Sequence, residues 1–65
     1  MSASRVADIL VERDGDSFDQ AMERVKECAV AIKDSGYNIA EADLILRDYI
    51  GLEPDYLFDV LETLE

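Results

Sequence analysis

The close spacing of three aspartates near residue 16 suggests a calcium-binding loop. They are Asp14, Asp16 and Asp19, and carboxylate oxygens are preferred ligands of Ca²⁺. An EF-hand loop beginning at Asp14 would need an oxygen donor at Phe18, glycine in place of Asp19 and glutamate in place of Val25. The segment therefore predicts a turn followed by a helix cap, built from short acidic side chains, and no metal site.

The string Gly15-Asp16-Ser17-Phe18 resembles the Asp-Ser-Leu motif of acyl carrier proteins. Those proteins are small, acidic and four-helical, and they carry phosphopantetheine on that serine at a helix N-terminus. The resemblance covers a few residues: a longer helix and loop precede the serine in that family, and Phe18 replaces the usual leucine. Ser17 is predicted to be a helix N-cap, and an acyl-carrier-like protein modified at Ser17 is kept as an alternative function.

The chain has a single cysteine, Cys28, and no histidine. A lone cysteine cannot close an internal disulfide, and without histidine it lacks both a general base and the partners of a Cys/His zinc site. Adjacent carboxylates are expected by chance in so acidic a chain, and a domain of this size has no room for a substrate cleft. We therefore predict that the protein is not an enzyme and uses no cofactor.

The composition predicts one folded domain with a strong negative charge. The 65 residues carry 16 acidic and 6 basic side chains, a net charge of -10, and 49% of them are hydrophobic, too many for an acidic disordered tail. The absence of a basic patch and of a glycine-rich phosphate loop argues against direct nucleic-acid binding. The sequence shows no membrane span and no secretion signal, so we expect a cytoplasmic protein without membrane contact.

Gly15, Gly36 and Gly51 divide the chain into four segments of helical periodicity, because a helix often ends where one residue becomes left-handed. The first predicted helix runs from about Ala3 to Arg13, and a strand from Val6 to Val11 stays open as an alternative. Its apolar side chains are Ala3, Val6, Ala7 and Leu10, with Ile9 and Val11 widening the apolar arc.

The second segment has the clearest helical pattern. Ser17 and Gln20 match a capping box, and Gly36 with Tyr37 predicts a Schellman ending in which Tyr37 folds back toward Ile32. The apolar residues recur at steps of four and three: Phe18, Met22, Val25, Ala29 and Ile32.

The last two segments begin at Asn38 and Pro54. Asn38 followed by Glu41 is an N-cap pattern, and Pro54 suits the first turn of a helix that reaches Leu64. Short connections between the segments predict an all-α fold, a compact bundle of three to four short antiparallel helices in one domain over residues 1–65. The inward side chains would be Ile39, Ala42, Ile45, Leu46, Tyr49 and Ile50, then Leu57, Val60, Leu61 and Leu64.

Negative charge is concentrated in the second half of the chain. Residues 1–37 hold eight acids and five bases, a net charge of -3, whereas residues 38–65 hold eight acids and one base, a net charge of -7. Helical wheels also leave four hydrophobic side chains outside the core, namely Val30, Leu44, Tyr56 and Phe58. Acids beside exposed hydrophobic residues indicate a surface that binds another protein.

The stretch from Asp48 to Leu61, with Gly-Leu-Glu-Pro-Asp-Tyr at residues 51–56, resembles the C-terminus of short acidic proteins encoded by bacteriophages and prophages of Gram-positive bacteria. The resemblance covers roughly a quarter of the chain, and the family brings no known activity. It implies a phage-encoded protein in the host cell cytoplasm, and a small acidic phage protein can act as a decoy whose carboxylates imitate the phosphates of DNA.

These observations predict a non-enzymatic acidic interaction protein that binds a host or phage protein, as a DNA-mimic inhibitor would. The expected partner is a basic protein that itself binds nucleic acid. We also expect homo-oligomers, and a structural, self-associating accessory protein is a further alternative. The residues predicted to contact the partner are Glu41, Leu44, Asp48, Glu53, Asp55, Tyr56, Phe58, Asp59 and Glu62.

Overall fold

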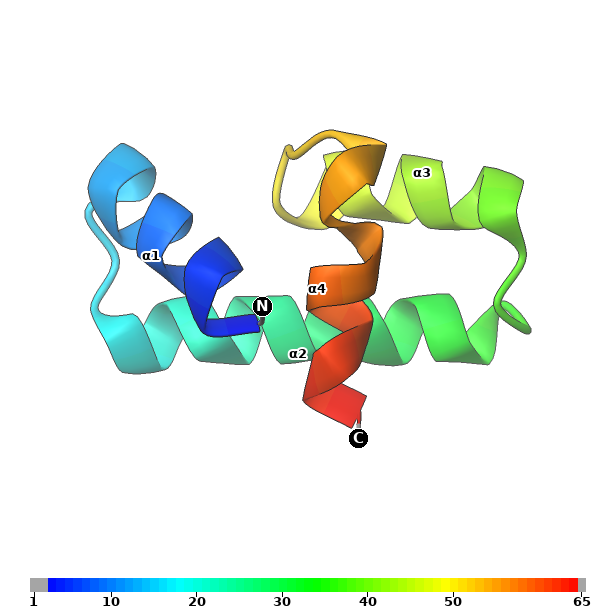
Figure 1. Ribbon diagram of the computed structural model, residues 1–65, viewed down its shortest axis with the longest axis horizontal. Coiled ribbons are helices and arrows are strands. Elements are labelled where there is room, and N and C mark those ends of the chain that lie inside the picture. The colour runs from blue at the N-terminus through cyan, green and yellow to red at the C-terminus, as the bar shows by residue number, and fades with distance from the viewer. Residues whose placement is uncertain (1–2, 65) are drawn as a thin grey trace.

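The chain folds into an all-α bundle, so the predicted fold class is confirmed (Figure 1). The computed structural model describes residues 3–64, and within that range there is no strand. The strand alternative from Val6 to Val11 is therefore wrong. The elements in chain order are α1 (Ala3–Asp14), α2 (Phe18–Asp34), α3 (Ile39–Tyr49), the 3₁₀ turn η1 (Pro54–Tyr56), α4 (Leu57–Leu61) and the 3₁₀ turn η2 (Glu62–Leu64).

α2 is the longest helix, and the other helices pack against it. α1 lies over its first half, α3 runs beside its second half in the opposite direction, and α4 crosses it between them (Figure 1). α4 also contacts α1 and α3. The molecule measures 30 × 21 × 17 Å along its principal axes.

The core contains only hydrophobic side chains among the described residues. Burying each large aliphatic side chain contributes about 1.5–3 kcal/mol, and these contributions offset the ordering entropy of a short chain. The side chain of Ala3, predicted to face inward, lies outside what the structure describes. The buried residues are Val6, Ala7, Leu10, Ala21, Val25, Cys28, Ala29, Ile32, Ala42, Leu46, Ile50 and Val60.

Three side chains predicted to face inward are exposed instead: Phe18, Ile39 and Tyr49. Phe18 and Ile39 are the first residues of α2 and α3, and Tyr49 is the last residue of α3. At a helix end the apolar stripe extends beyond the neighbouring helix that would cover it. Ala21 and Cys28 fill the α2 face in the middle of the bundle, where small side chains allow close packing.

The predicted helix caps are present. The Ser17 hydroxyl accepts a hydrogen bond from the Gln20 backbone N–H at 3.1 Å, and the Gln20 side chain accepts one from the Ser17 N–H at 3.3 Å, so the capping box is complete. Asn38 caps α3 by accepting from the Glu41 N–H at 3.1 Å. These bonds satisfy orphan donors and define where both helices begin.

The Schellman ending of α2 is also confirmed in its backbone. Gly36 N–H donates to the Lys33 carbonyl at 2.9 Å, and Tyr37 N–H donates to the Ile32 carbonyl at 3.1 Å. Gly36 has a φ of 79° and Tyr37 a φ of 59°, so two successive residues are left-handed. The Tyr37 side chain remains 52% exposed.

The segment after Gly51 differs from the continuous helix that was predicted from Pro54 to Leu64. It alternates between 3₁₀ and α geometry, and Val60 is its only fully buried residue within the described chain. Leu57, Leu61 and Leu64 pack half-buried against the core. So short a helix gains little from its own hydrogen bonds and depends on packing for its stability.

Candidate functional site

The structure brings three of the predicted contact residues together in one cleft. Phe58, Asp59 and Glu62 line a cleft of about 490 Å³, which we call the C-terminal cleft. Phe58 is 77% exposed. The remaining lining residues are Tyr37, from the connection between α2 and α3, and Leu61 and Leu64.

A second group of predicted residues lies on the outward side of α3. Glu41, Leu44 and Asp48 follow one another at steps of three and four, so they share one helix face. All three are exposed, Leu44 by 58%. They do not line the C-terminal cleft, and the predicted contact set therefore occupies two separate faces.

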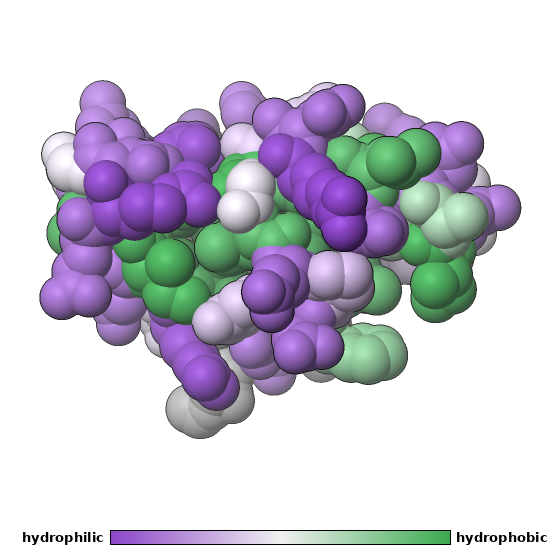
Figure 2. Space-filling model, turned by 90° about the horizontal axis from the view of Figure 1, so that it is seen from above, coloured by the Kyte–Doolittle hydropathy of each residue, from purple (hydrophilic) through white to green (hydrophobic). Residues whose placement is uncertain are grey.

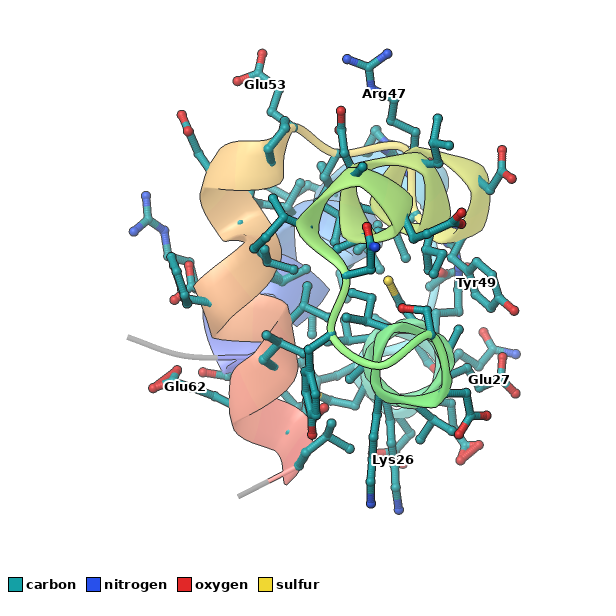
Figure 3. The ribbon with its side chains drawn as sticks, turned by 90° about the vertical axis from the view of Figure 1, so that its right-hand side faces the viewer. Lys26, Glu27, Arg47, Tyr49, Glu53 and Glu62 are labelled. Atoms are coloured by element: carbon teal, nitrogen blue, oxygen red, sulfur yellow. The ribbon has the colours of Figure 1, made fainter. Side chains whose placement is uncertain are left out.

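Glu53 and Asp55 are exposed in the connection and in η1, between these two faces. Glu53 projects from one end of the C-terminal segment (residues 51–64), and Glu62 lies toward its other end (Figure 3). Tyr56 was predicted to lie outside the core, but as the last residue of η1 it packs half-buried against the core. Tyr56 is therefore a packing residue as well as a candidate contact.

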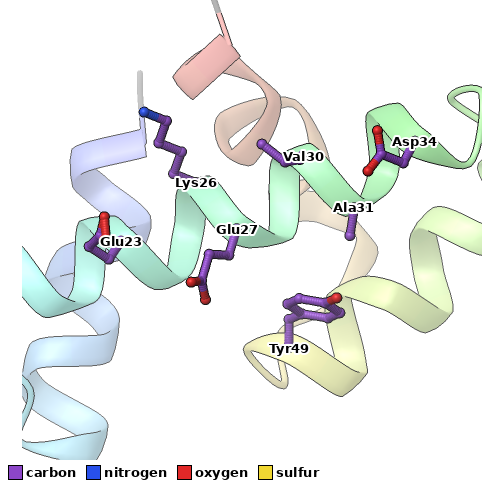
Figure 4. A pocket seen from close by; sticks show the side chains of 7 residues that line it. All are labelled: Glu23, Lys26, Glu27, Val30, Ala31, Asp34 and Tyr49. Carbon is purple, nitrogen blue, oxygen red and sulfur yellow. The ribbon is translucent and has the colours of Figure 1, made fainter.

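A shallow groove of about 500 Å³ on α2 was not predicted as a site. Its apolar residues are Val30, Ala31 and Tyr49, and it opens on the opposite side of the molecule from Glu62 (Figures 3 and 4). Tyr49 was assigned to the core in the sequence, which is why this groove was missed. The charged residues that line it are of both signs: Glu23, Lys26, Glu27 and Asp34.

An apolar pocket of about 300 Å³ lies between the start of α3 and η1. Its residues include Ile39, which is 71% exposed, and the half-buried Leu57. Asp43 lies at its edge with Oδ1 3.4 Å from Arg47 Nε. From above, hydrophobic residues are visible between hydrophilic side chains across this side of the molecule (Figure 2).

Two arginines from the first half of the chain form ion pairs and hydrogen bonds with other residues of the chain. Arg24 Nη1 lies 2.9 Å from Asp14 Oδ2 and 2.6 Å from Asp16 Oδ2, and Arg24 Nη2 donates to the Tyr49 carbonyl at 3.4 Å. Arg13 also pairs with Asp14, at 2.8 Å. We call Arg13, Arg24, Asp14 and Asp16 the arginine cluster.

The arginine cluster also caps the end of α3. Arg13 Nη2 donates to the Ile50 carbonyl at 2.7 Å, and Arg13 Nη1 donates to the Gly51 carbonyl at 3.3 Å. Carbonyls at a helix C-terminus lack partners in the helix and carry partial negative charge, so guanidinium groups stabilise them. The contacts join residues 37 and 38 positions apart, and no local spacing in the sequence could indicate them.

The hydrogen bonds of the cluster shift the ionisation of Asp14. Donation from Arg13, and then from Arg24, holds the pKa of Asp14 well below its ordinary value. Asp14 and Asp16, the first two members of the suspected calcium loop, thus bind guanidinium groups. Among residues 3–64, no three cysteine, aspartate or glutamate side chains converge as a metal site requires.

The two remaining candidate groups, Cys28 and Ser17, lie in the core and at a helix cap. Burial raises the pKa of the Cys28 thiol to about 11, so the thiolate is scarce at neutral pH. Ser17 is exposed at the N-terminus of α2 with its hydroxyl engaged in the capping box, and its modification as a carrier serine stays a prediction. No helix within residues 3–64 has the length and apolar character needed to cross a membrane.

Comparison of the chain with models of protein families, with curated proteins and with solved structures finds no significant match.

Proposed function

We propose that this chain is a non-enzymatic interaction domain that binds a basic protein through its C-terminal segment. One observation carries the proposal. The segment presents four carboxylates, no basic side chain and the exposed ring of Phe58, and two of the carboxylates share the C-terminal cleft with that ring. Its acids are Glu53, Asp55, Asp59 and Glu62.

The distribution of basic residues supports the same conclusion. Arg13 and Arg24 are held by the arginine cluster, and Arg47 lies beside Asp43 on α3. Within residues 3–64 no ion pair involves the four acids of the C-terminal segment. Uncompensated charge steers a partner of opposite sign, and exposed apolar side chains then provide short-range affinity.

We propose further that the partner is a host or phage protein with a basic nucleic-acid-binding surface, and that this chain blocks it by mimicking DNA. The resemblance of residues 48–61 to acidic phage proteins supports this choice, as does the row of carboxylates along the C-terminal segment. A protein that acts in this way competes with duplex DNA for its partner. Binding would weaken as salt rises, because exposed charges are screened.

The test compares two charge-reversed variants in affinity capture from a bacterial lysate. Each variant changes the net charge by the same amount, and each includes an acid from the first turn of an α-helix. We expect only the first variant to lose a partner that duplex DNA displaces, and equal capture by both variants would contradict the proposal. The first variant replaces Asp55, Asp59 and Glu62 with lysine, and the control replaces Asp8, Glu12 and Asp19 with lysine.

Self-association is the second candidate function, and the exposed side chains of Ile39, Leu44 and Phe58 favour it. The accessible surface of the single chain is 4124 Å², close to the roughly 4,200 Å² expected for a monomer of this mass. If the chain self-associates, each subunit is therefore already as compact as a folded monomer of this size. Light scattering at low and high salt separates the two functions: a salt-independent dimer favours self-association, and a monomer favours the basic partner.

A further inference from the structure

The C-terminal cleft combines aromatic rings and carboxylates with no basic residue among those that line it. Tyr37 and Phe58 are both exposed by more than half, by 52% and 77%. Asp59 and Glu62 come from the same short segment, and Leu61 and Leu64 supply half-buried apolar surface. A ligand that fits this lining carries positive charge and has an apolar or planar body.

The backbone of Tyr37 supports a role for its ring in this cleft. A Schellman ending requires one left-handed residue, and Gly36 already supplies it. Tyr37 is also left-handed, with a φ of 59°, a conformation that is unfavourable for a bulky side chain. Asparagine would adopt it at lower cost. The exposed ring thus lines the cleft from a backbone conformation that is unfavourable for tyrosine.

Resting on the proposed function, we propose that the C-terminal cleft binds an arginine side chain of the basic partner. A guanidinium group is planar, stacks on aromatic faces and donates paired hydrogen bonds to carboxylates. An ammonium group is compact and more strongly hydrated, so it uses the aromatic faces less well. In the bound state the guanidinium lies against Tyr37 and Phe58 and pairs with Asp59 or Glu62.

Two other concave surfaces of the described residues lack this combination. The groove on α2 is lined by Lys26 as well as by acids, so its charge does not select a cation. The pocket between α3 and η1 has one acid, Asp43, which already lies beside Arg47. The C-terminal cleft therefore has stronger charge complementarity to a basic side chain than either of these two surfaces.

The test titrates the protein into a short fluorescein-labelled peptide in which arginine alternates with glycine, followed by fluorescence anisotropy. The matched peptide has lysine at each arginine position and the same charge. We expect the wild-type protein to prefer the arginine peptide and Phe58→Leu to weaken its binding about 3- to 10-fold, because leucine keeps the apolar contact but removes the aromatic face. Phe18→Leu makes the same substitution at an exposed phenylalanine at the start of α2, outside the C-terminal cleft, so it serves as the control and leaves binding unchanged.

Tyr37→Asn provides a second readout that a merely structural role would not give. Asparagine adopts the left-handed conformation at lower cost than tyrosine, so we expect the midpoint of thermal unfolding to stay at or above that of the wild type. Because the variant lacks the aromatic ring, we expect it to bind the arginine peptide more weakly. A preference for the lysine peptide, or unchanged binding in both Phe58→Leu and Tyr37→Asn, would overturn the arginine site.

The two proposals can fail separately. If the lysine variant at Asp55, Asp59 and Glu62 loses its partner while Phe58→Leu and Tyr37→Asn both bind the arginine peptide like the wild type, the arginine site is wrong and the proposed function stands. If neither partner capture nor peptide binding depends on those three acids, both proposals are wrong.

Discussion

The connection between α1 and α2 and the C-terminal segment are both acidic, but their carboxylates have different surroundings. Asp14 and Asp16 accept hydrogen bonds from Arg24, which also reaches the end of α3. Asp59 and Glu62 lie beside an exposed phenylalanine in a cleft lined by no basic side chain. One region uses its charge within the fold, and the other presents it to solvent.

This difference distinguishes the acids that stabilise the fold from those that do not. A carboxylate bonded to a guanidinium group favours the folded state, whereas an unpaired carboxylate in a chain of charge -10 adds to self-repulsion. Residues that add repulsion without internal partners are typical of sites that serve binding at a cost in stability. The comparison therefore assigns the arginine cluster to stability and is consistent with the proposed role of the C-terminal segment in recognition.

The largest expected effect is a loss of stability when a core leucine is truncated, and we expect it to be larger in α1 than in the C-terminal segment. Leu10→Ala removes a fully buried side chain of α1 and should lower the free energy of unfolding by about 2–5 kcal/mol, much of the roughly 3–10 kcal/mol available to a chain of this size. Leu61→Ala, at a half-buried position, should lower it by about 1 kcal/mol. Urea unfolding followed by circular dichroism measures both, and equal losses would mean that the C-terminal segment is as integral to the core as α1.

A smaller effect tests the arginine cluster. Arg24→Ala removes hydrogen bonds to Asp14, Asp16 and the Tyr49 carbonyl, and we expect a loss of about 1–2 kcal/mol because these bonds are partly shielded from water. Arg47→Ala, in an exposed pair on α3, is the matched control and should cost less than about 0.5 kcal/mol. If the thermal unfolding midpoint fell equally in both variants, the arginine cluster would contribute no more to stability than the exposed pair on α3, which would contradict this prediction.

The smallest effect is a pH dependence. The pKa of Asp14 is lowered in the folded state, so the unfolded chain binds the proton more tightly, and the stabilisation from Asp14 is present above its ordinary value of 3.8 and lost as pH falls below it. Asp14→Asn should reduce stability at pH 7 and flatten the loss of stability below about pH 4. Asp8→Asn, on the exposed face of α1, is the control. Identical acid unfolding curves for wild type and Asp14→Asn would refute this assignment.

Local signals in the sequence were sufficient for the fold class and the helix starts. The capping box of Ser17 and Gln20, the Asn38 cap and the Gly36 turn each depend on residues within a few positions of one another. Such caps and turns form through hydrogen bonds between neighbouring residues, so the local sequence is enough to predict them, and all of them are present as predicted.

Tertiary packing determined the features that the sequence did not indicate. The arginine cluster joins residues far apart in the chain, and the broken helix after Pro54 packs against α1 and α2. Tyr37 was predicted from its turn pattern, but its place in the C-terminal cleft depends on the path of α4. Charge counts located the acidic half of the chain, yet they could not show that its contact residues divide between the outward face of α3 and the C-terminal cleft.

The most direct test of the central claim neutralises the two sets of acids and compares the free energy of unfolding in urea. One variant carries Asp14→Asn with Asp16→Asn, and the other carries Asp55→Asn, Asp59→Asn and Glu62→Gln. We predict that the first variant is less stable than the wild type, and that the second stays within about 0.5 kcal/mol of it or exceeds it, because relief of repulsion offsets the lost favourable interaction with helix N-termini. A second variant as destabilised as the first would show that the acids of the C-terminal segment serve the fold, contradicting their assignment to recognition.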